Sequence, residues 1–256
     1  MSGPPDQRER PVLSVVVPVL DEEKGLPELH RRLGEALAEV QGQVELIYVD
    51  DGSTDGSARL LEGWTRSEDR VTLVQLSRNF GMEVAMSAGI DHARGQHVVL
   101  MHADLQDPPE LVPQMLELAR GGADVVFARR IGREESAIKR ALATAFYGVM
   151  GRLARVPYQG QAGDFRLMSE PVVEAIRQMP ERRRFLRGMV AWVGFRQVPI
   201  EYRRAGRTSG RGASYPQLFR LALEAIASFS DVPLSVASYL GLLTATLSAF
   251  GAALLA

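Results

Sequence analysis

Acidic side chains gather directly after three apolar runs of this chain, where they could act together as ligands. The clusters occupy residues 18–23, 50–57 and 102–110, and they bring Asp and Glu together with Ser, His and Gln. Each cluster alone is explained by turns and helix N-caps, which favour Asp and Ser. Together the carboxylates would repel one another unless they bound a cation or accepted hydrogen bonds from hydroxyl and NH groups. The pattern therefore predicts a site for a metal ion, a nucleotide and a sugar.

The elements that must position these clusters follow from the apolar pattern. Five runs rich in β-branched residues lie at 12–17, 44–49, 71–76, 97–101 and 123–128. Segments with helical periodicity lie between them, at 22–40, 57–66, 80–93 and 109–119. This alternation predicts βα units with a mostly parallel sheet, which is an α/β fold. Ligands of such sheets bind beyond the carboxyl ends of the strands, where all three clusters fall.

Composition and charge exclude several classes of protein. Of 256 residues, 46% are hydrophobic and 24% charged, which is typical of a globular core and not of a disordered chain. The absence of cysteine excludes disulfides, thiolate zinc sites and cysteine nucleophiles. Residues 1–128 hold 11 Lys and Arg against 22 Asp and Glu, a net charge of −11, whereas residues 129–256 hold 19 against 9, or +10. The asymmetry favours a charged, phosphorylated substrate.

The two ends differ in character from the body of the chain. Residues 1–10 are polar and predict a disordered leader with no signal peptide. Residues 232–256 carry no charge, and a helix of that length would measure about 37 Å, enough to cross a hydrocarbon core of ~30 Å. We expect a transmembrane helix there, with a buried helix as the alternative. Residues 213–231 are expected to form an amphipathic helix at the membrane interface, although packing on the sheet explains their spacing equally well.

Short motifs narrow the possibilities further. No G-x-G-x-x-G follows the first run, and neither a P-loop nor H-E-x-x-H occurs, which removes the main support for a dehydrogenase, a P-loop NTPase or a zincin. The motifs that are present resemble those of the family 2 glycosyltransferases of GT-A fold. More narrowly, they are similar to the polyprenyl-phosphate glycosyltransferases, a group that includes dolichyl-phosphate mannose synthase and the bactoprenol glucosyltransferases. The resemblance covers roughly residues 11–256 and is carried by residues 15–23, 49–57, 76–81, 103–110, 163–167 and 184–188. It implies a catalytic domain at 11–212.

The resemblance also implies roles for individual residues. Asp104 and Gln106 are similar to the family's ligands for Mg²⁺ or Mn²⁺, and His102 stands at a further ligand position. The positions that match nucleotide contacts are Pro18, Leu20, Glu22, Val49, Asp51, Ser53 and Ala103. Arg129 is similar to a phosphate-contacting arginine, and it is expected to act in catalysis together with Asp104 and Asp164. The basic loop that holds Arg204, Arg207 and Arg211 is similar to one that closes over the donor diphosphate, or else is a solvated surface loop.

The acceptor in such a reaction is a phosphate monoester, whose second pKa of about 6 leaves it largely ionised at neutral pH. It needs no general base to become a nucleophile. Asp164 is therefore expected to orient the acceptor or to stabilise positive charge on the anomeric carbon, and a helix N-cap is its alternative role. The resemblance implies inversion at that carbon.

Three departures from the family's motifs stand out. His102 replaces the first acidic residue of a D-x-D motif, which removes one negative charge from the metal site. Met82 replaces a basic residue, and residues 206–211 replace a short Gly-x-Ser-Lys loop. The His102 imidazole can ligate Mn²⁺ or only accept a water, and activity could survive with Asp104 and Gln106 alone.

The resemblance thus implies an inverting, metal-dependent transfer of a hexose from a nucleotide sugar to polyprenyl (undecaprenyl) phosphate, and the acidic clusters and the charge asymmetry agree with such a substrate. UDP-glucose is the first expectation for the donor, and GDP-mannose or a modified UDP-sugar is the alternative. A non-catalytic, membrane-tethered nucleotide-sugar-binding protein is the alternative from another class. We expect the inner membrane as the location, with the catalytic domain facing the cytoplasm and no nucleic acid partner. Small residues in the C-terminal helix, such as Gly241 and Ser248, would permit a homo-oligomer.

Overall fold

A computed structural model describes two parts of the chain. The described residues are 10–131, 162–181, 184–203, 238–242, 244–246, 248 and 253. Contacts divide the chain into two compact units, one made of Met1–Glu134 and Gln161–Gly210, the other of Glu135–Gly160 and Arg211–Ala256. The described residues of the second unit are helical.

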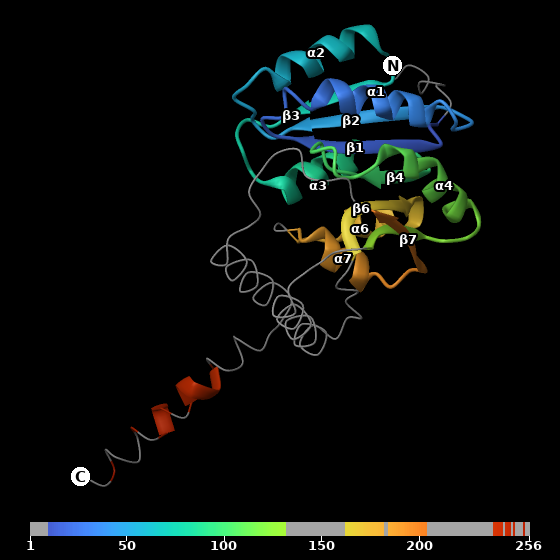
Figure 1. The fold of residues 1–256 in the computed structure, drawn as a ribbon. Coiled ribbons are helices and arrows are strands. Elements are labelled where there is room, and N and C mark those ends of the chain that lie inside the picture. Colours follow the sequence, from blue (N-terminus) through green and yellow to red (C-terminus); the bar gives the residue numbers. More distant parts are fainter. Residues whose placement is uncertain are drawn as a thin grey trace, which may run out of the picture. The chain divides into compact units, whose positions relative to one another are not determined.

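The first unit is built on a seven-stranded sheet in the order β3-β2-β1-β4-β6-β5-β7 (Figure 1). The strands are β1 (Leu13–Val19), β2 (Val44–Asp50), β3 (Val71–Gln75), β4 (His97–Leu100), β5 (Val125–Ile131), β6 (Ala162–Ser169) and β7 (Gln197–Arg203). Neighbouring pairs β3–β2, β2–β1, β1–β4 and β5–β7 are parallel, whereas β6 runs antiparallel to both β4 and β5. The predicted mostly parallel sheet is confirmed.

Helices cover both faces of this sheet. They are α1 (Leu26–Leu37), α2 (Ser57–Ser67), α3 (Met82–His92), α4 (Val112–Arg120), α6 (Glu170–Gln178) and α7 (Leu186–Trp192), with a short 3₁₀ turn, η1 (Pro109–Leu111), before α4. Leu residues of α1, with α2 and α4, pack on one face of the sheet. The apolar sides of α3, α6 and α7 pack on the other. The result is a three-layer α/β architecture.

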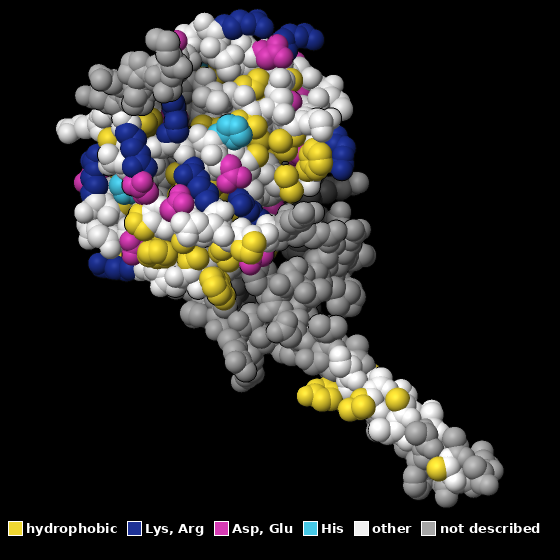
Figure 2. Space-filling model, turned by 180° about the vertical axis from the view of Figure 1, so that it is seen from behind, with side chains coloured by type: hydrophobic (Ala, Val, Ile, Leu, Met, Phe, Trp, Pro, Cys, Tyr) yellow, Lys and Arg dark blue, Asp and Glu magenta, His cyan; other side chains and the backbone are white. Residues whose placement is uncertain are grey.

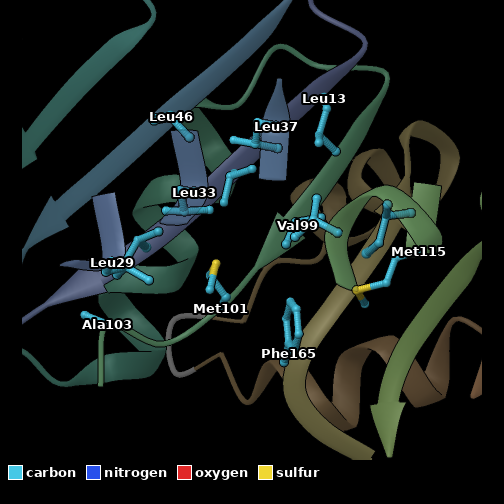
Figure 3. Close-up of a cluster of buried hydrophobic side chains, with 14 of the residues drawn as sticks. Leu13, Leu29, Leu33, Leu37, Leu46, Val99, Met101, Ala103, Met115 and Phe165 are labelled. Carbon is cyan, nitrogen blue, oxygen red and sulfur yellow. The ribbon is translucent and has the colours of Figure 1, made fainter. Parts of the chain in front are cut away.

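The core beneath α1 and α4 reaches as far as the predicted site. Figure 3 shows Leu29 and Leu33 of α1 close to Met101 and Ala103, which follow β4, while Phe165 of β6 lies on the other side of Met101. All five side chains are buried. The polypeptide that leaves β4 is therefore anchored by apolar packing before it reaches the polar residues of the edge.

The predicted elements agree with the structure in most of the chain. The five predicted strands correspond to β1–β5, and the four predicted helical segments correspond to α1, α2, α3 and η1 with α4. The first helix begins at Leu26 and not at residue 22, because Asp21 adopts a φ of 54° and residues 23–25 form a turn. Pro27 lies in the first turn of the helix, where its missing N–H costs nothing. Strands β6 and β7 were not predicted.

Several predictions for the chain ends fall outside the described residues. These are the interfacial helix at 213–231, nearly all of the leader at 1–10 and most of the span at 232–256. In the portion of the chain that is described, no helix combines the length and the apolar character needed to cross a membrane.

The candidate site residues lie at one edge of the sheet, where the parallel strands end. Because β1, β2, β4 and β5 run in the same direction, their carboxyl ends lie at this edge. Strand β6 runs the other way, so it begins at the same edge. Asp164, near the start of β6, therefore joins residues that follow the ends of the parallel strands.

Candidate active site

Hydrogen bonds join the loop after β1 to the loop after β2. The Asp21 carboxylate oxygen Oδ1 accepts from the Thr54 N–H at 2.7 Å. The Ser53 hydroxyl oxygen accepts from the Asp21 N–H at 3.0 Å, and the Ser57 hydroxyl oxygen accepts from the Glu22 N–H at 3.0 Å. These contacts bring the predicted nucleotide-binding residues Glu22 and Ser53 to one place at the edge.

The other predicted nucleotide contacts differ in how much of each side chain a ligand could reach. Pro18 and Val49 are partners in the β1–β2 register, and both are buried. Leu20, just beyond β1, is 39% exposed. The Ala103 methyl group packs in the core, so any contact that Ala103 makes with a ligand comes from its backbone.

Asp51 organises the loop that follows β3. Its Oδ1 accepts from the Phe80 N–H at 2.7 Å, and its Oδ2 accepts from the Gly81 N–H at 2.9 Å. Gly52, with a φ of 78°, lies so close to this loop that a Cβ atom would stand 2.6 Å from the Arg78 carbonyl carbon. The Arg78 guanidinium in turn lies 4.1 Å from the centre of the Phe80 ring. The buried Asp51 carboxylate is thus already engaged with the backbone of the neighbouring loop.

The loop after β4 is held by its own carboxylates. Asp104 Oδ1 accepts from the Gln106 N–H at 3.1 Å, and Leu105 between them has a φ of 59°. Asp107 Oδ2 accepts from the His102 N–H at 3.1 Å. Gln106 and Asp107 are buried, whereas His102 and Asp104 remain partly exposed. This places the Asp104 carboxylate at the accessible side of the loop.

The loop after β1 also lies next to the loop after β4, since a Cβ atom on Gly25 would stand 3.7 Å from Glu22 Oε2 and 3.9 Å from the Ala103 carbonyl oxygen. The pKa of Glu22 is raised, first by burial and then by the negative charges of Asp104, Asp55 and Asp21. These carboxylates come from three different loops. A site with this negative potential attracts cations and hydrogen-bond donors, as the sequence predicts.

Asp164 is the centre of a second cluster, formed by β4, β6 and α7. Both of its carboxylate oxygens accept from the Arg187 guanidinium, one from Nε and one from Nη2. The His102 Nε2 lies 3.3 Å from Asp164 Oδ2, and the Arg166 Nη2 lies 3.9 Å from Oδ1. Asp164 is only 10% exposed.

The charges in this cluster determine its protonation. Burial raises the pKa of the Asp164 carboxyl, but its bonds with Arg187 and His102 outweigh burial and hold the pKa well below its usual range. Burial lowers the pKa of the His102 imidazole, but the hydrogen bond with Asp164 and the charges of Asp107 and Asp104 outweigh that effect and raise the pKa. Asp164 is therefore an ionised carboxylate whose negative charge is compensated from two sides.

Arg129 forms a different contact. Its guanidinium pairs with Glu201 across the β5–β7 register, and both side chains are partly exposed. An exposed pair of this kind contributes about 0–1 kcal/mol, so the arginine can change partners at little cost. Arg204, Arg207 and Arg211 lie outside the described residues.

The amino-acid sequence of this chain is similar to those of known glycosyltransferases. The sequence pattern of glycosyl transferase family 2 matches residues 14–177, which is more than half of the chain. The chain belongs to glycosyl transferase family 2. An uncharacterized glycosyltransferase of Synechocystis is 44% identical over 92% of this chain and 75% of its own length. The bactoprenol glucosyl transferase of Shigella phage SfV is 39% identical over 92% of this chain and 78% of its own length.

A solved structure supports the same fold. Glucosyl-3-phosphoglycerate synthase of Mycobacterium tuberculosis, crystallised with Mn²⁺, UDP-glucose and glycerol 3-phosphate, superposes with a TM-score of 0.57. The two sequences are 22% identical, and the match covers 85% of this chain and 78% of that chain. At this identity the likeness shows the fold, which is the predicted GT-A fold of the family 2 enzymes.

Within this family 2 site, the structure brings together Glu22, Asp104, His102 and Asp164, all of which the sequence singled out. It adds Arg187 and Glu83. The Leu186 N–H donates to Glu83 Oε2 at 3.0 Å, which ties the start of α7 to α3. Arg187 lies in the motif at residues 184–188, one of those that carry the resemblance to family 2. It is 23 positions from Asp164, however, and no local sequence pattern predicts their contact.

The donors present fit a metal ion only if the substrate supplies further ligands. Among the residues that the structure describes, no group of three or more His, Asp or Glu side chains is arranged to hold a metal. Asp104 offers one accessible carboxylate, whereas the His102 Nε2 faces Asp164. Mg²⁺ is commonly held by one or two carboxylates together with substrate phosphates, and Asp104 fits that pattern.

Proposed function

We propose that this family 2 glycosyltransferase transfers glucose from a nucleotide sugar, UDP-glucose in the first instance, to a polyprenyl phosphate such as undecaprenyl phosphate. The observation that carries the proposal is the meeting of Glu22, Asp104, His102 and Asp164 at one sheet edge. It occurs in a chain 39% identical to a bactoprenol glucosyl transferase over 92% of its length. That identity supports both the glucosyl group and the lipid acceptor.

The reaction needs positioning more than proton transfer. An oxygen of the ionised acceptor phosphate attacks the anomeric carbon, and the bond from that carbon to the nucleoside diphosphate breaks, with inversion. Asp164, held as a carboxylate by Arg187, is suited to stabilise positive charge that develops on the sugar. It has no need to take a proton, because the acceptor is already largely ionised.

The donor is expected at the loops after β1, β2 and β4. Leu20, Glu22 and Ser53 offer a side chain or a hydroxyl at the edge, while Pro18, Val49 and Ala103 are buried and contribute shape and backbone groups. Asp51 supports this surface through the loop that it holds. Arg129, Arg204, Arg207 and Arg211 are proposed phosphate contacts, and Arg129 would leave Glu201 to make its contact.

A divalent cation, Mg²⁺ or Mn²⁺, is part of the proposal. Asp104 would hold it, with Gln106 as a second proposed ligand and the donor diphosphate as the remainder of the coordination shell. When bound, the ion neutralises negative charge on the leaving diphosphate.

The acceptor implies a membrane. We propose that residues 232–256 cross the inner membrane, that residues 213–231 lie at its interface and that the catalytic domain at 11–212 faces the cytoplasm. A homo-oligomer through the C-terminal helix remains part of the same proposal. Nucleic acid is not an expected partner, because basic and acidic side chains are interspersed on the face shown in Figure 2 and form no continuous basic stripe there.

The test is direct. Detergent-purified full-length protein is incubated with undecaprenyl phosphate, Mn²⁺ or Mg²⁺, and labelled UDP-glucose or GDP-mannose, and the label that enters the lipid phase is counted with and without EDTA. We expect transfer from UDP-glucose that EDTA abolishes and that Asp104→Asn strongly reduces. Asp69→Asn is the matched control, since Asp69 is exposed just before β3, at the opposite edge of the sheet. Bound UDP without transfer from any donor would contradict the proposal and favour a non-catalytic binding protein.

A further inference from the structure

The register of β4 and β6 places His102 opposite Asp164. In this antiparallel pair Val99 faces Leu167, and Leu100 faces Arg166. Continuing the pairing by two residues sets position 102 against position 164. The observed separation of 3.3 Å between His102 Nε2 and Asp164 Oδ2 agrees with that register. The contact is therefore a product of strand pairing and not an accident of a free loop.

The backbone of His102 is also fixed. Its N–H donates to Asp107 Oδ2 at 3.1 Å, and Asp107 is itself buried. Met101 and Ala103, on either side of it, are buried in the core. With both neighbours packed and the N–H bonded, the backbone that carries the imidazole is held in place opposite Asp164.

Arg187 of α7 donates hydrogen bonds to the same carboxylate. Its Nε and Nη2 each bond one oxygen of Asp164, which is the bidentate geometry that a planar guanidinium favours. The helix that carries it is held in place, because the Leu186 N–H bonds Glu83 of α3. Arg166, almost fully buried, bonds the Gly163 carbonyl oxygen at 2.8 Å and so supports the backbone next to Asp164.

From this geometry we infer that His102 and Arg187 are positioning residues that hold the Asp164 carboxylate in its working orientation. His102 then acts through Asp164 and is not a metal ligand. The inference rests on the proposed function, in which Asp164 faces the reacting sugar. Because Nε2 faces Asp164, only Nδ1 of the imidazole could coordinate a cation, and the affinity for Mn²⁺ tests whether it does.

Three variants separate positioning from metal binding. His102→Ala removes the donor to Asp164, whereas in His102→Gln the side-chain amide nitrogen can reach the place of Nε2 and donate in its stead. Arg187→Lys keeps the positive charge but loses the planar guanidinium that bonds both oxygens of Asp164. His92→Gln is the matched control, because His92 is exposed at the end of α3 and bonds only a carbonyl of its own helix among the contacts described.

The kinetic test compares the effect of each variant on kcat with its effect on the binding of UDP-glucose and Mn²⁺. We expect His102→Ala to lower kcat by about 10²-fold, since small misplacements of catalytic groups have effects of that order. The KM for UDP-glucose and the affinity for Mn²⁺ in the presence of UDP, measured by electron paramagnetic resonance, should stay within about twofold. His102→Gln should recover most of kcat, and Arg187→Lys should fall between wild type and Arg187→Ala. Equal loss in both His102 variants, with Mn²⁺ bound about tenfold more weakly or worse, would instead make His102 a metal ligand.

A second readout needs no turnover. The protein has four histidines, so ¹⁵N-histidine labelling gives a simple spectrum in which loss of a signal in His102→Gln assigns His102. The substitution Asp164→Asn should shift the His102 Nε2 resonance. Addition of UDP and Mg²⁺ to the wild type, with no paramagnetic Mn²⁺ present, should leave that resonance nearly unchanged. A resonance that responds to Mg²⁺ but not to Asp164→Asn would overturn the inference. If the wild type transfers no sugar at all, the proposed function fails while this spectrum still decides whether His102 is bonded to Asp164.

Discussion

Asp51→Asn should loosen the loop after β3 and thereby destabilise the fold, besides any effect on the nucleotide. In the wild type both carboxylate oxygens accept backbone hydrogen bonds, from Phe80 at 2.7 Å and from Gly81 at 2.9 Å. Asparagine keeps one acceptor oxygen but presents an amide NH₂ to the other N–H. One hydrogen bond is lost, and its partly buried donor is left facing a second donor.

The size of the effect follows from the kind of bond. Hydrogen bonds to charged groups contribute about 1.5–3 kcal/mol, so Asp51→Asn should lower the free energy of unfolding by about that amount. Asp51→Ala, which removes both acceptors, should cost roughly 3–6 kcal/mol on the same basis. For a unit of this size each kcal/mol lowers Tm by roughly 2–4 °C, which gives a fall of about 3–12 °C for Asp51→Asn.

Two measurements test this reasoning. Thermal unfolding of the purified protein gives the change in Tm, with Asp69→Asn as a control that should leave it within about 2 °C. Hydrogen exchange should accelerate at the Phe80 and Gly81 amides before it changes elsewhere. If Asp51→Asn lost UDP binding while Tm and the exchange of both amides stayed at wild-type values, the structural role assigned to Asp51 would be refuted and only a ligand contact would remain.

Three further changes probe other parts of the site. Gly89→Ala should lower stability by about 1–3 kcal/mol in thermal unfolding, because its Cβ would stand 2.2 Å from Val16 Cγ1, whereas Gly63→Ala, which meets nothing within 4 Å, should be neutral or stabilising. Burial raises the pKa of the Glu83 carboxyl, and the negative charge of Asp164 adds to this effect. Together they outweigh the Leu186 N–H and the two nearby arginines, which lower that pKa. The stabilising contribution of Glu83 is therefore present below the unfolded pKa and lost as pH rises through the folded pKa, so Glu83→Gln should raise Tm at pH 7.5 and not at pH 4. Asp104→Asn keeps the acceptor for the Gln106 N–H but removes a charge, so it should raise the Mn²⁺ concentration needed for half-maximal transfer by about tenfold or more with little change in Tm.

The strands that could be predicted are those whose local sequence matches their environment. Strands β1, β2 and β4 lie inside the sheet and are almost entirely buried, so their apolar β-branched runs are visible without any tertiary information. The acidic residues directly after them then mark the edge where ligands bind. This is why Glu22, Asp104 and His102 could be named as members of one site.

Strands β6 and β7 escaped prediction for physical reasons. The middle of β6 contains Arg166, whose burial is compensated by the Gly163 carbonyl oxygen and by nearby Asp164, a contact that only the folded chain provides. Strand β7 pairs only with β5 at the end of the sheet, and it carries Pro199 together with polar residues. Edge strands tolerate proline and charge, so their sequences lack the apolar signature of inner strands.

The missed strand explains why the contact between His102 and Asp164 was not predicted, although both residues were named from the sequence. Because β6 is antiparallel between β4 and β5, it delivers Asp164 to the edge from its first residues, directly across from position 102. An acidic residue at 102, as the resemblance would have it, would set two carboxylates face to face and would need a cation between them. With His102 the two side chains are complementary by themselves. In the proposed mechanism a metal ion is then held by Asp104 and the diphosphate of the donor, while Asp164 is held by His102 and Arg187 without a metal.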